Sequence, residues 1–121
     1  MLNFLRPAAP RPQVTPSQIA DQVARGEASL IDVRETAELR ASGKAKGAVH
    51  IPLSLIPLKA DPSTPDCEKS LSRDRPVFVY CASGARSAMA AQALTRLGYG
   101  QVTNLGGLNA WVAEGGQVER V

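Results

Sequence analysis

The sequence of 121 residues has few cysteines, few aromatic residues and no long apolar run. Its two cysteines, Cys67 and Cys81, are fewer than a disulfide-stapled secreted domain usually carries, which favours a reducing compartment. An aromatic content of 4% provides no stacking platform for single-stranded nucleic acid. No apolar segment approaches the roughly 20 residues that cross a bilayer. These absences exclude a disulfide scaffold, a single-strand binder and a membrane-spanning protein.

A strong excess of charge is also missing. The formal net charge is +3, and Lys and Arg do not cluster, so we expect no nucleic-acid partner. The mild positive charge still suits small anionic substrates. One histidine and two separate cysteines cannot form a tetrahedral zinc site, so we expect no metal. Residues 1–7 are too short and too soon broken by proline to act as a signal peptide, and we expect a cytoplasmic location.

What the chain does have is the composition of one soluble globular domain. Hydrophobic residues make up 44% and charged residues 21%, and the length is sufficient to bury a core without disulfides. Three prolines lie among the first dozen residues. We therefore predict an extended, proline-rich arm over residues 1–13 and a single domain over residues 14–121.

Short strands and helices alternate along this domain. Strands are predicted over 28–33, 49–52, 76–80 and 101–105. Helices are predicted from Thr15, which can cap the first one, to Gly26, and over 35–41, 53–56, 87–97 and 108–113. Residues 59–75 read as an irregular connection and Gly106-Gly107 as a turn. This order predicts an α/β fold, with a mainly parallel central sheet and helices on both faces. In such sheets a ligand binds beyond the carboxyl ends of the strands.

Cys81 directly follows the most apolar strand, over residues 76–80, and precedes a predicted helix. The small residues between them let the backbone curl, so that its N–H groups point inward as an anion-binding nest. Such surroundings lower the pKa of a thiol from about 8.5 towards roughly 3.5–7.5. We predict Cys81 as the catalytic nucleophile. The residues predicted to bind substrate are Ala82, Ser83, Gly84, Ala85, Arg86 and Ser87, with Arg86 supplying a fixed cation.

The same cradle would stabilise a persulfide on Cys81. A sulfur atom is then loaded and unloaded in two covalent steps, which require no metal and no organic cofactor. Such chemistry needs only a small anionic sulfur donor and a nucleophilic acceptor.

Four segments in order resemble the signatures of the rhodanese family, over nearly all of residues 15–113. They are Asp32-Val33-Arg34-Glu35 followed by Glu38, Gly47 to Leu53, Val79 to Ala88, and Asn104 to Trp111. The resemblance implies a rhodanese-like α/β fold and a thiosulfate sulfurtransferase type of enzyme with a persulfide intermediate on Cys81. Donors would be thiosulfate or a low-molecular-weight persulfide, and acceptors a thiol, cyanide or a sulfur-accepting protein.

The length of the loop separates this chain from related families. Four residues lie between Cys81 and Arg86. Dual-specificity phosphatases and arsenate reductases resemble this loop but have one residue more, which widens the cradle for a tetrahedral oxyanion. Two departures from the rhodanese pattern concern the donor. Ala82 stands where some thiosulfate-using members have a basic residue, and Lys44 to Lys46 either add positive charge near the site or change a surface turn.

Several other residues have two interpretations. Asp32 and Arg34 are predicted to form a supporting ion pair rather than to act in catalysis. His50 suits a packing or rim position, since thiolate transfer needs no general base. Cys67 is either an incidental thiol or a resolving cysteine for Cys81. The alternative function is a sulfur-carrier or protein-binding module that turns over small donors poorly, because a fold alone does not establish activity.

Overall fold

The computed structural model describes residues 14–121, and the predicted arm over residues 1–13 lies outside them. The elements follow in the order α1 (Pro16–Ala24), β1 (Ser29–Asp32), α2 (Thr36–Ser42), β2 (Lys44–Ala45), β3 (Val49–His50), the 3-10 helix η2 (Leu53–Leu55), α3 (Ile56–Lys59), β4 (Val77–Cys81), α4 (Ala85–Arg96), β5 (Val102–Gly107), α5 (Leu108–Ala113) and β6 (Val118–Glu119). All strands and helices predicted from the sequence are present, with small shifts at their ends.

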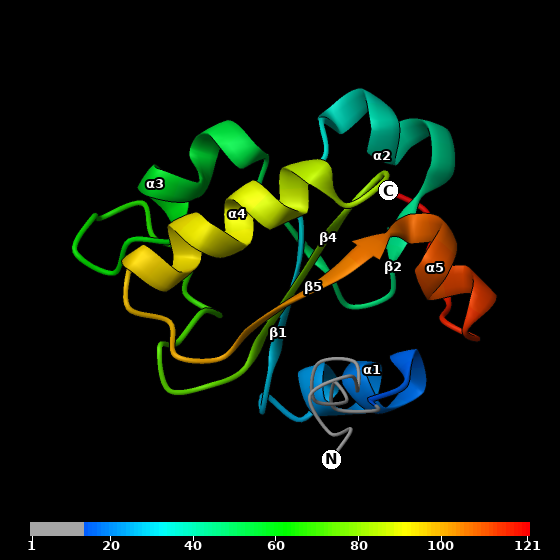
Figure 1. The fold of residues 1–121 in the computed structure, drawn as a ribbon, viewed down its shortest axis with the longest axis horizontal. Helices are drawn as coiled ribbons and strands as arrows, with labels where there is room; N and C mark the ends of the chain where they lie inside the picture. Colours follow the sequence, from blue (N-terminus) through cyan, green and yellow to red (C-terminus); the bar gives the residue numbers. More distant parts are fainter. Residues whose placement is uncertain (1–13) are drawn as a thin grey trace, which may run out of the picture.

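The central sheet has four strands in the order β3-β1-β4-β5, and every pairing is parallel (Figure 1). The predicted α/β architecture is therefore confirmed. Strand β4 lies between β1 and β5 and is buried along its whole length. Its carboxyl end brings Cys81 to the edge of the sheet at which β1 also ends.

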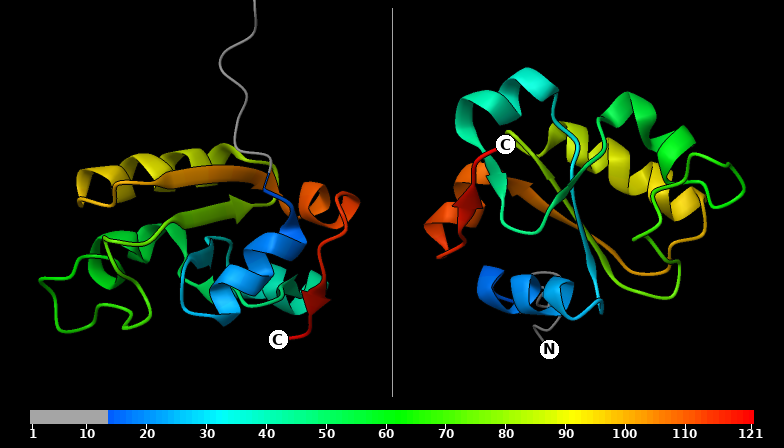
Figure 2. Two further views of the ribbon diagram at one scale, coloured as in Figure 1. Left: turned by 90° about the horizontal axis from the view of Figure 1, so that it is seen from below. Right: turned by 180° about the vertical axis from the view of Figure 1, so that it is seen from behind.

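Helices cover both faces of this sheet (Figure 2). Alternate residues of β4 enter two separate apolar clusters because side chains of a strand point to opposite faces. Val77, Val79 and Cys81 pack on the side of α3 and α4. Phe78 and Tyr80 pack on the side of α1 and α5. The thiol thus belongs to the face that α4 covers.

Local sequence signals account for the first helix. The Thr15 side chain accepts a hydrogen bond from the Gln18 N–H at 3.1 Å, and the Gln18 side chain accepts from the Thr15 N–H at 2.8 Å. This reciprocal pair is the predicted capping box, with Pro16 at the first helical position. No helix among residues 14–121 is long and apolar enough to cross a membrane.

Two local expectations were wrong or incomplete. Gly106 and Gly107 are the last residues of β5 rather than a turn, because a register irregularity lets them pair with β4. A small antiparallel sheet of β2 and β6 was not predicted, since each strand has only two residues.

Candidate active site

Cys81 is the last residue of β4, and helix α4 begins only four residues later, at Ala85. Gly84 lies between them with φ of +107°, in the left-handed region that glycine adopts at little cost. This residue lets the chain reverse from strand to helix in a tight loop. Cys81 itself is 0% exposed, whereas the loop residues Ala82, Ser83 and Ala85 are exposed around it.

Backbone N–H groups surround the Cys81 sulfur, as the sequence predicted. The N–H of Gly84 lies 2.9 Å and that of Ser87 3.4 Å from Sγ. The Ser87 hydroxyl lies 3.3 Å from the same sulfur. Burial raises the pKa of the thiol, but the hydrogen bonds from Ser87, Gly84 and Ser83 outweigh it and lower the pKa from 9.0 to about 7. A substantial fraction of Cys81 is therefore thiolate at neutral pH.

Asn104 on β5 connects the loop to the neighbouring strand. Its Oδ1 accepts hydrogen bonds from the Ser87 hydroxyl at 2.7 Å and from the Gly106 N–H at 2.9 Å. Its Nδ2 donates to the carbonyl oxygen of Gly84 at 3.2 Å. Sequence reasoning placed Asn104 in a family signature but gave it no role, because its contacts depend on the register between β4 and β5.

Gly107 allows the close approach of β5 to the loop. It pairs with Cys81 across the sheet, and a Cβ at this position would overlap the carbonyl oxygen of Ala82. Gly107 therefore has a different role from the predicted turn. The absence of a side chain at this position makes room for the backbone of the loop beside the thiol.

Arg86 points its guanidinium at Glu38 on α2. Nη1 donates to Oε1 at 2.7 Å and Nη2 to Oε2 at 2.9 Å, a bidentate ion pair in which each side chain is 34% exposed. The hydrogen bond to Arg86 lowers the pKa of the Glu38 carboxyl from 4.5 to about 2. The predicted role of Arg86 in substrate binding stays a prediction, and its carboxylate partner is a contact that the sequence did not indicate.

Asp32 and Arg34 form the predicted ion pair beneath the site. Arg34 Nη2 donates to Asp32 Oδ2 at 2.8 Å, and both side chains are buried. The Tyr80 hydroxyl also donates to Asp32 Oδ2, at 2.5 Å, and accepts from the Ala45 N–H at 2.8 Å. Arg34 donates further to the carbonyl oxygen of Gly43 at 2.6 Å. The network fastens the end of α2 and strand β2 to the central sheet.

The remaining singled-out residues lie away from the sulfur. His50 Nε2 is 2.6 Å from the carbonyl oxygen of Arg34, a contact that fits the predicted packing position. Cys67 is a free thiol in the connection between α3 and β4, and burial followed by Asp61 and Glu68 raises its pKa. Lys44 Nζ forms an ion pair with Glu119 Oε2 at 2.5 Å across the small sheet, so the positive charge of Lys44 is paired with that carboxylate.

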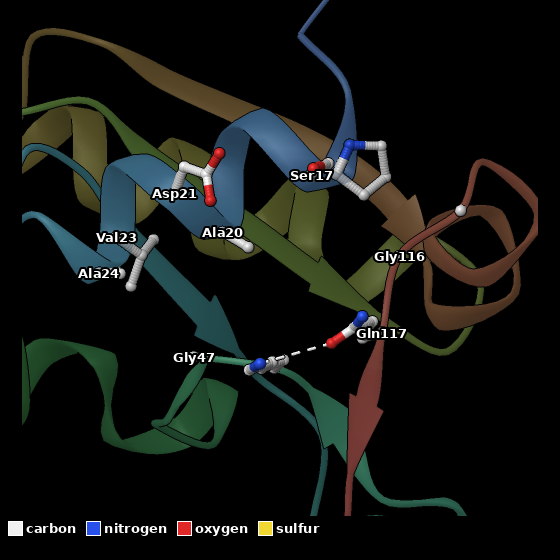
Figure 3. Close-up of a pocket in the computed structure, with 11 residues that line it drawn as sticks. Ser17, Ala20, Asp21, Val23, Ala24, Gly47, Gly116 and Gln117 are labelled. Atoms are coloured by element: carbon white, nitrogen blue, oxygen red, sulfur yellow. Dashed lines mark hydrogen bonds between the residues drawn. The ribbon is translucent and has the colours of Figure 1, made fainter.

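A groove of about 310 Å³ lies elsewhere, between α1 and residues 115–117. Ser17, Ala20 and Asp21 line one side, and Gly116 and Gln117 line the other (Figure 3). Lys46 also lines the groove, and its Nζ donates a hydrogen bond to Gln117 Oε1 at 3.4 Å. None of its lining residues belongs to the Cys81 loop.

The sequence of this chain matches a known protein family. The family model of the rhodanese-like domain matches residues 15–114. A sulfurtransferase from Allochromatium vinosum is 40% identical over 87 residues, which span 71% of this chain and 73% of that protein.

Two solved structures share the fold. A thiosulfate sulfurtransferase from Pseudomonas aeruginosa superposes with a TM-score of 0.71 at 34% identity, over 88% of this chain and 19% of that one. A protein of unknown function from Rhodopseudomonas palustris, described as a possible tyrosine phosphatase, superposes with a TM-score of 0.73 at 28% identity, over 88% of this chain and 83% of that one.

Proposed function

The chain belongs to the family of rhodanese-like domains and has sulfurtransferase relatives, and we propose that it transfers sulfane sulfur through a persulfide on Cys81. The observation that carries the proposal is the set of N–H and O–H groups around Sγ, which lowers the pKa of the thiol to about 7. Those donors suit a thiolate, which is the nucleophile in sulfur exchange. They suit the terminal sulfur anion of a persulfide for the same electrostatic reason.

The reaction has two displacement steps. The Cys81 thiolate attacks the outer sulfur of a donor such as thiosulfate, the sulfur–sulfur bond of the donor breaks, and sulfite leaves with the bonding electrons. Cys81 then carries the persulfide Cys81–S–S⁻. An acceptor thiolate or cyanide attacks the terminal sulfur, which restores the Cys81 thiolate and releases a new persulfide or thiocyanate. No proton transfer is needed in either step when both nucleophiles are anions.

Thiosulfate or a low-molecular-weight persulfide is the proposed donor, and a thiol, cyanide or a sulfur-accepting protein the proposed acceptor. The cytoplasmic location expected from the two cysteines, both free in the structure, belongs to the same proposal. The thiol is buried beneath its loop, so a donor must pass between the exposed loop residues or displace them.

Intact-mass spectrometry tests the proposal. The Cys67→Ser variant, which leaves Cys81 as the single cysteine, is incubated with thiosulfate or with a small persulfide. We expect one added sulfur atom, removed by cyanide as thiocyanate. The Cys81→Ser variant should gain no sulfur. Sulfur addition and thiocyanate formation that persist in Cys81→Ser would overturn the proposal.

One observation favours the alternative of a sulfur carrier with little turnover of small donors. Both terminal nitrogens of Arg86 are engaged by Glu38, so the cation expected to bind an anionic donor is already paired. Steady-state turnover separates the two functions. A carrier would accept one sulfur atom and hold it until a protein acceptor is supplied, whereas an enzyme would turn over with cyanide.

A phosphatase activity is not expected, because the loop between Cys81 and Arg86 has only four residues. Hydrolysis of an aryl phosphate by the protein, with loss of that activity in Cys81→Ser, would reverse this conclusion.

A further inference from the structure

One cation and two carboxylates lie at the mouth of the Cys81 loop. Arg86 makes the bidentate ion pair with Glu38, at 2.7 and 2.9 Å. Glu35 is close enough to Arg86 to stabilise its charge as well, and so is Cys81. Arg86, Glu38 and Glu35 therefore have a formal net charge of −1, before the Cys81 thiolate is counted.

The topology of the sheet explains why these charges meet. Glu35 and Glu38 belong to the start of α2, which follows β1, and Arg86 belongs to the start of α4, which follows β4. Strands β1 and β4 are parallel neighbours, so both helices begin at the same edge of the sheet (Figure 1). Glu38 is held at this edge by a second hydrogen bond, in which its Oε1 accepts from the Glu35 N–H at 2.9 Å.

The ion pair with Glu38 limits how Arg86 can bind an anionic sulfur donor. A guanidinium binds a carboxylate or a sulfonate-like group through two parallel N–H bonds, and Glu38 already accepts one such bond from each terminal nitrogen of Arg86. An oxyanion that approaches Cys81 must share Arg86 with Glu38 or displace it. Because each side chain is only one-third exposed, solvent screens the repulsion incompletely. The free-energy cost of bringing the donor next to Glu38 therefore rises with the negative charge of the donor.

We propose that Glu38 is a specificity-determining residue that makes this site favour sulfur donors with one negative charge over dianionic donors. This inference rests on the proposed function, and it narrows the donor class of the same site. Methanethiosulfonate and thiosulfate are suitable probes because the same sulfur–sulfur bond breaks in both. With the monoanion, Cys81–S⁻ and CH₃SO₂S⁻ give Cys81–S–S⁻ and CH₃SO₂⁻. With the dianion, Cys81–S⁻ and S₂O₃²⁻ give Cys81–S–S⁻ and SO₃²⁻.

The Glu38→Gln variant tests the proposal in steady-state assays with cyanide as acceptor. Glutamine keeps the length of the side chain and an oxygen that can accept the Glu35 N–H. We expect kcat/KM for thiosulfate to increase about tenfold, through a lower KM, and kcat/KM for methanethiosulfonate to increase about threefold at most, since Coulomb energy scales with donor charge. The ratio of the two values is the readout, because a general disturbance of the loop would change both donors alike.

Glu27→Gln is the matched control. Glu27 pairs with Arg25 on the surface, where both side chains are 57% exposed, and its substitution changes the net charge by the same single unit. We expect it to leave the donor ratio unchanged. Glu35→Gln is a second variant, expected to shift the ratio in the direction of Glu38→Gln but by less, and it keeps the proposal testable if Glu38→Gln does not fold.

These measurements distinguish a failure of the proposed donor preference from a failure of the proposed function. A Glu38→Gln variant in which KM rises equally for both donors would show that Glu38 only holds Arg86 in place, and would overturn the proposal. An equal shift of the ratio in Glu27→Gln would also overturn it, in favour of overall charge. If the protein gains no sulfur adduct on Cys81 from either donor, as judged by intact mass, the proposed function itself fails, and the inference fails with it.

Discussion

Ser87 is the residue whose side chain most directly controls the state of the Cys81 thiol. Its hydroxyl lies 3.3 Å from Sγ and 2.7 Å from Asn104 Oδ1. A hydroxyl has one proton to donate, and a thiolate can only accept. When Cys81 is neutral, its S–H can donate to Ser87, and Ser87 can donate to Asn104. When Cys81 is ionised, Ser87 can donate to the sulfur only by giving up its bond to Asn104. Asn104 and the thiolate therefore compete for one proton.

Substitution of Ser87 by Ala should raise the pKa of Cys81 above its value of about 7. A hydrogen bond to a charged group contributes about 1.5–3 kcal/mol, and one pKa unit corresponds to about 1.4 kcal/mol, so the loss of this bond corresponds to an increase of about 1–2 units. We expect the lower end of this range, because Asn104 competes for the same Ser87 proton. The rate of alkylation by iodoacetamide as a function of pH measures this pKa in the Cys67→Ser background. At pH 9 the two proteins should react at similar rates.

Ser72→Ala provides the control for this measurement. The Ser72 hydroxyl accepts a hydrogen bond from the Asp74 N–H at 3.2 Å in the connection before β4, away from the sulfur. Its alkylation profile should superimpose on that of the parent. If the profile of Ser87→Ala also superimposes on that of the parent, the Ser87 hydroxyl does not lower the pKa of Cys81.

At the scale of elements, helix α2 is positioned by buried charge rather than by apolar packing alone. Leu39 is its one buried residue. Arg34 donates to the Ser42 hydroxyl at 2.8 Å and to the Gly43 carbonyl oxygen at 2.6 Å, both at the end of the helix. Asp32 holds Arg34 from the end of β1. The buried pair thereby sets where α2 lies, and α2 carries the Glu38 that meets Arg86.

The Arg34→Met variant should lower the free energy of unfolding by about 3–5 kcal/mol, because Asp32 would remain buried without its cationic partner. The Arg25→Met variant removes the cation of an exposed pair with Glu27 and should lower the free energy of unfolding by no more than about 1 kcal/mol. Urea unfolding followed by circular dichroism measures both values. Equal costs for the two variants would show that the buried pair contributes no more than the surface one.

At the scale of the whole molecule, ion pairs connect segments that are distant along the chain. Glu38 bonds to Arg86, and Glu119 of β6 bonds to Lys44 of β2. The hydrogen bond from the cationic partner lowers the pKa of each carboxyl, in Glu38 from 4.5 to about 2. Between those two values the unfolded chain binds more protons at Glu38 than the folded protein does. The stabilisation is therefore complete above about pH 5 and is lost as the pH falls towards 2.

Thermal unfolding between pH 6 and pH 2 should accordingly show a Tm that decreases with acidification. The decrease should be smaller in Glu38→Gln and in Arg86→Gln, because each variant removes one partner of the pair that depresses the pKa. Circular dichroism at a series of pH values measures the slope. If both variants lose Tm as steeply as the parent, other carboxylates account for the acid sensitivity.

Much of the fold was predictable because its signals are local. The capping residues Thr15 and Gln18 predict the first helix, and the apolar run before Cys81 predicts the central strand. The two-residue strands β2 and β6 could not be predicted, because a pair of residues has no periodicity to recognise. Gly106 and Gly107 were misread for a related reason, since a glycine pair in a strand and in a turn look alike until the neighbouring strand is in place.

The sequence by itself determined the thiol and its cradle, because Cys81, the small loop residues and the helix start that follows are contiguous along the chain. It also determined the family, through motifs that each occupy a short segment. Only the tertiary structure decided the surroundings of the thiol. Arg86 and Glu38 are 48 residues apart in sequence, and Ser87 and Asn104 are 17 apart. These pairs meet because β1, β4 and β5 are parallel neighbours in a specific register, which no local pattern specifies.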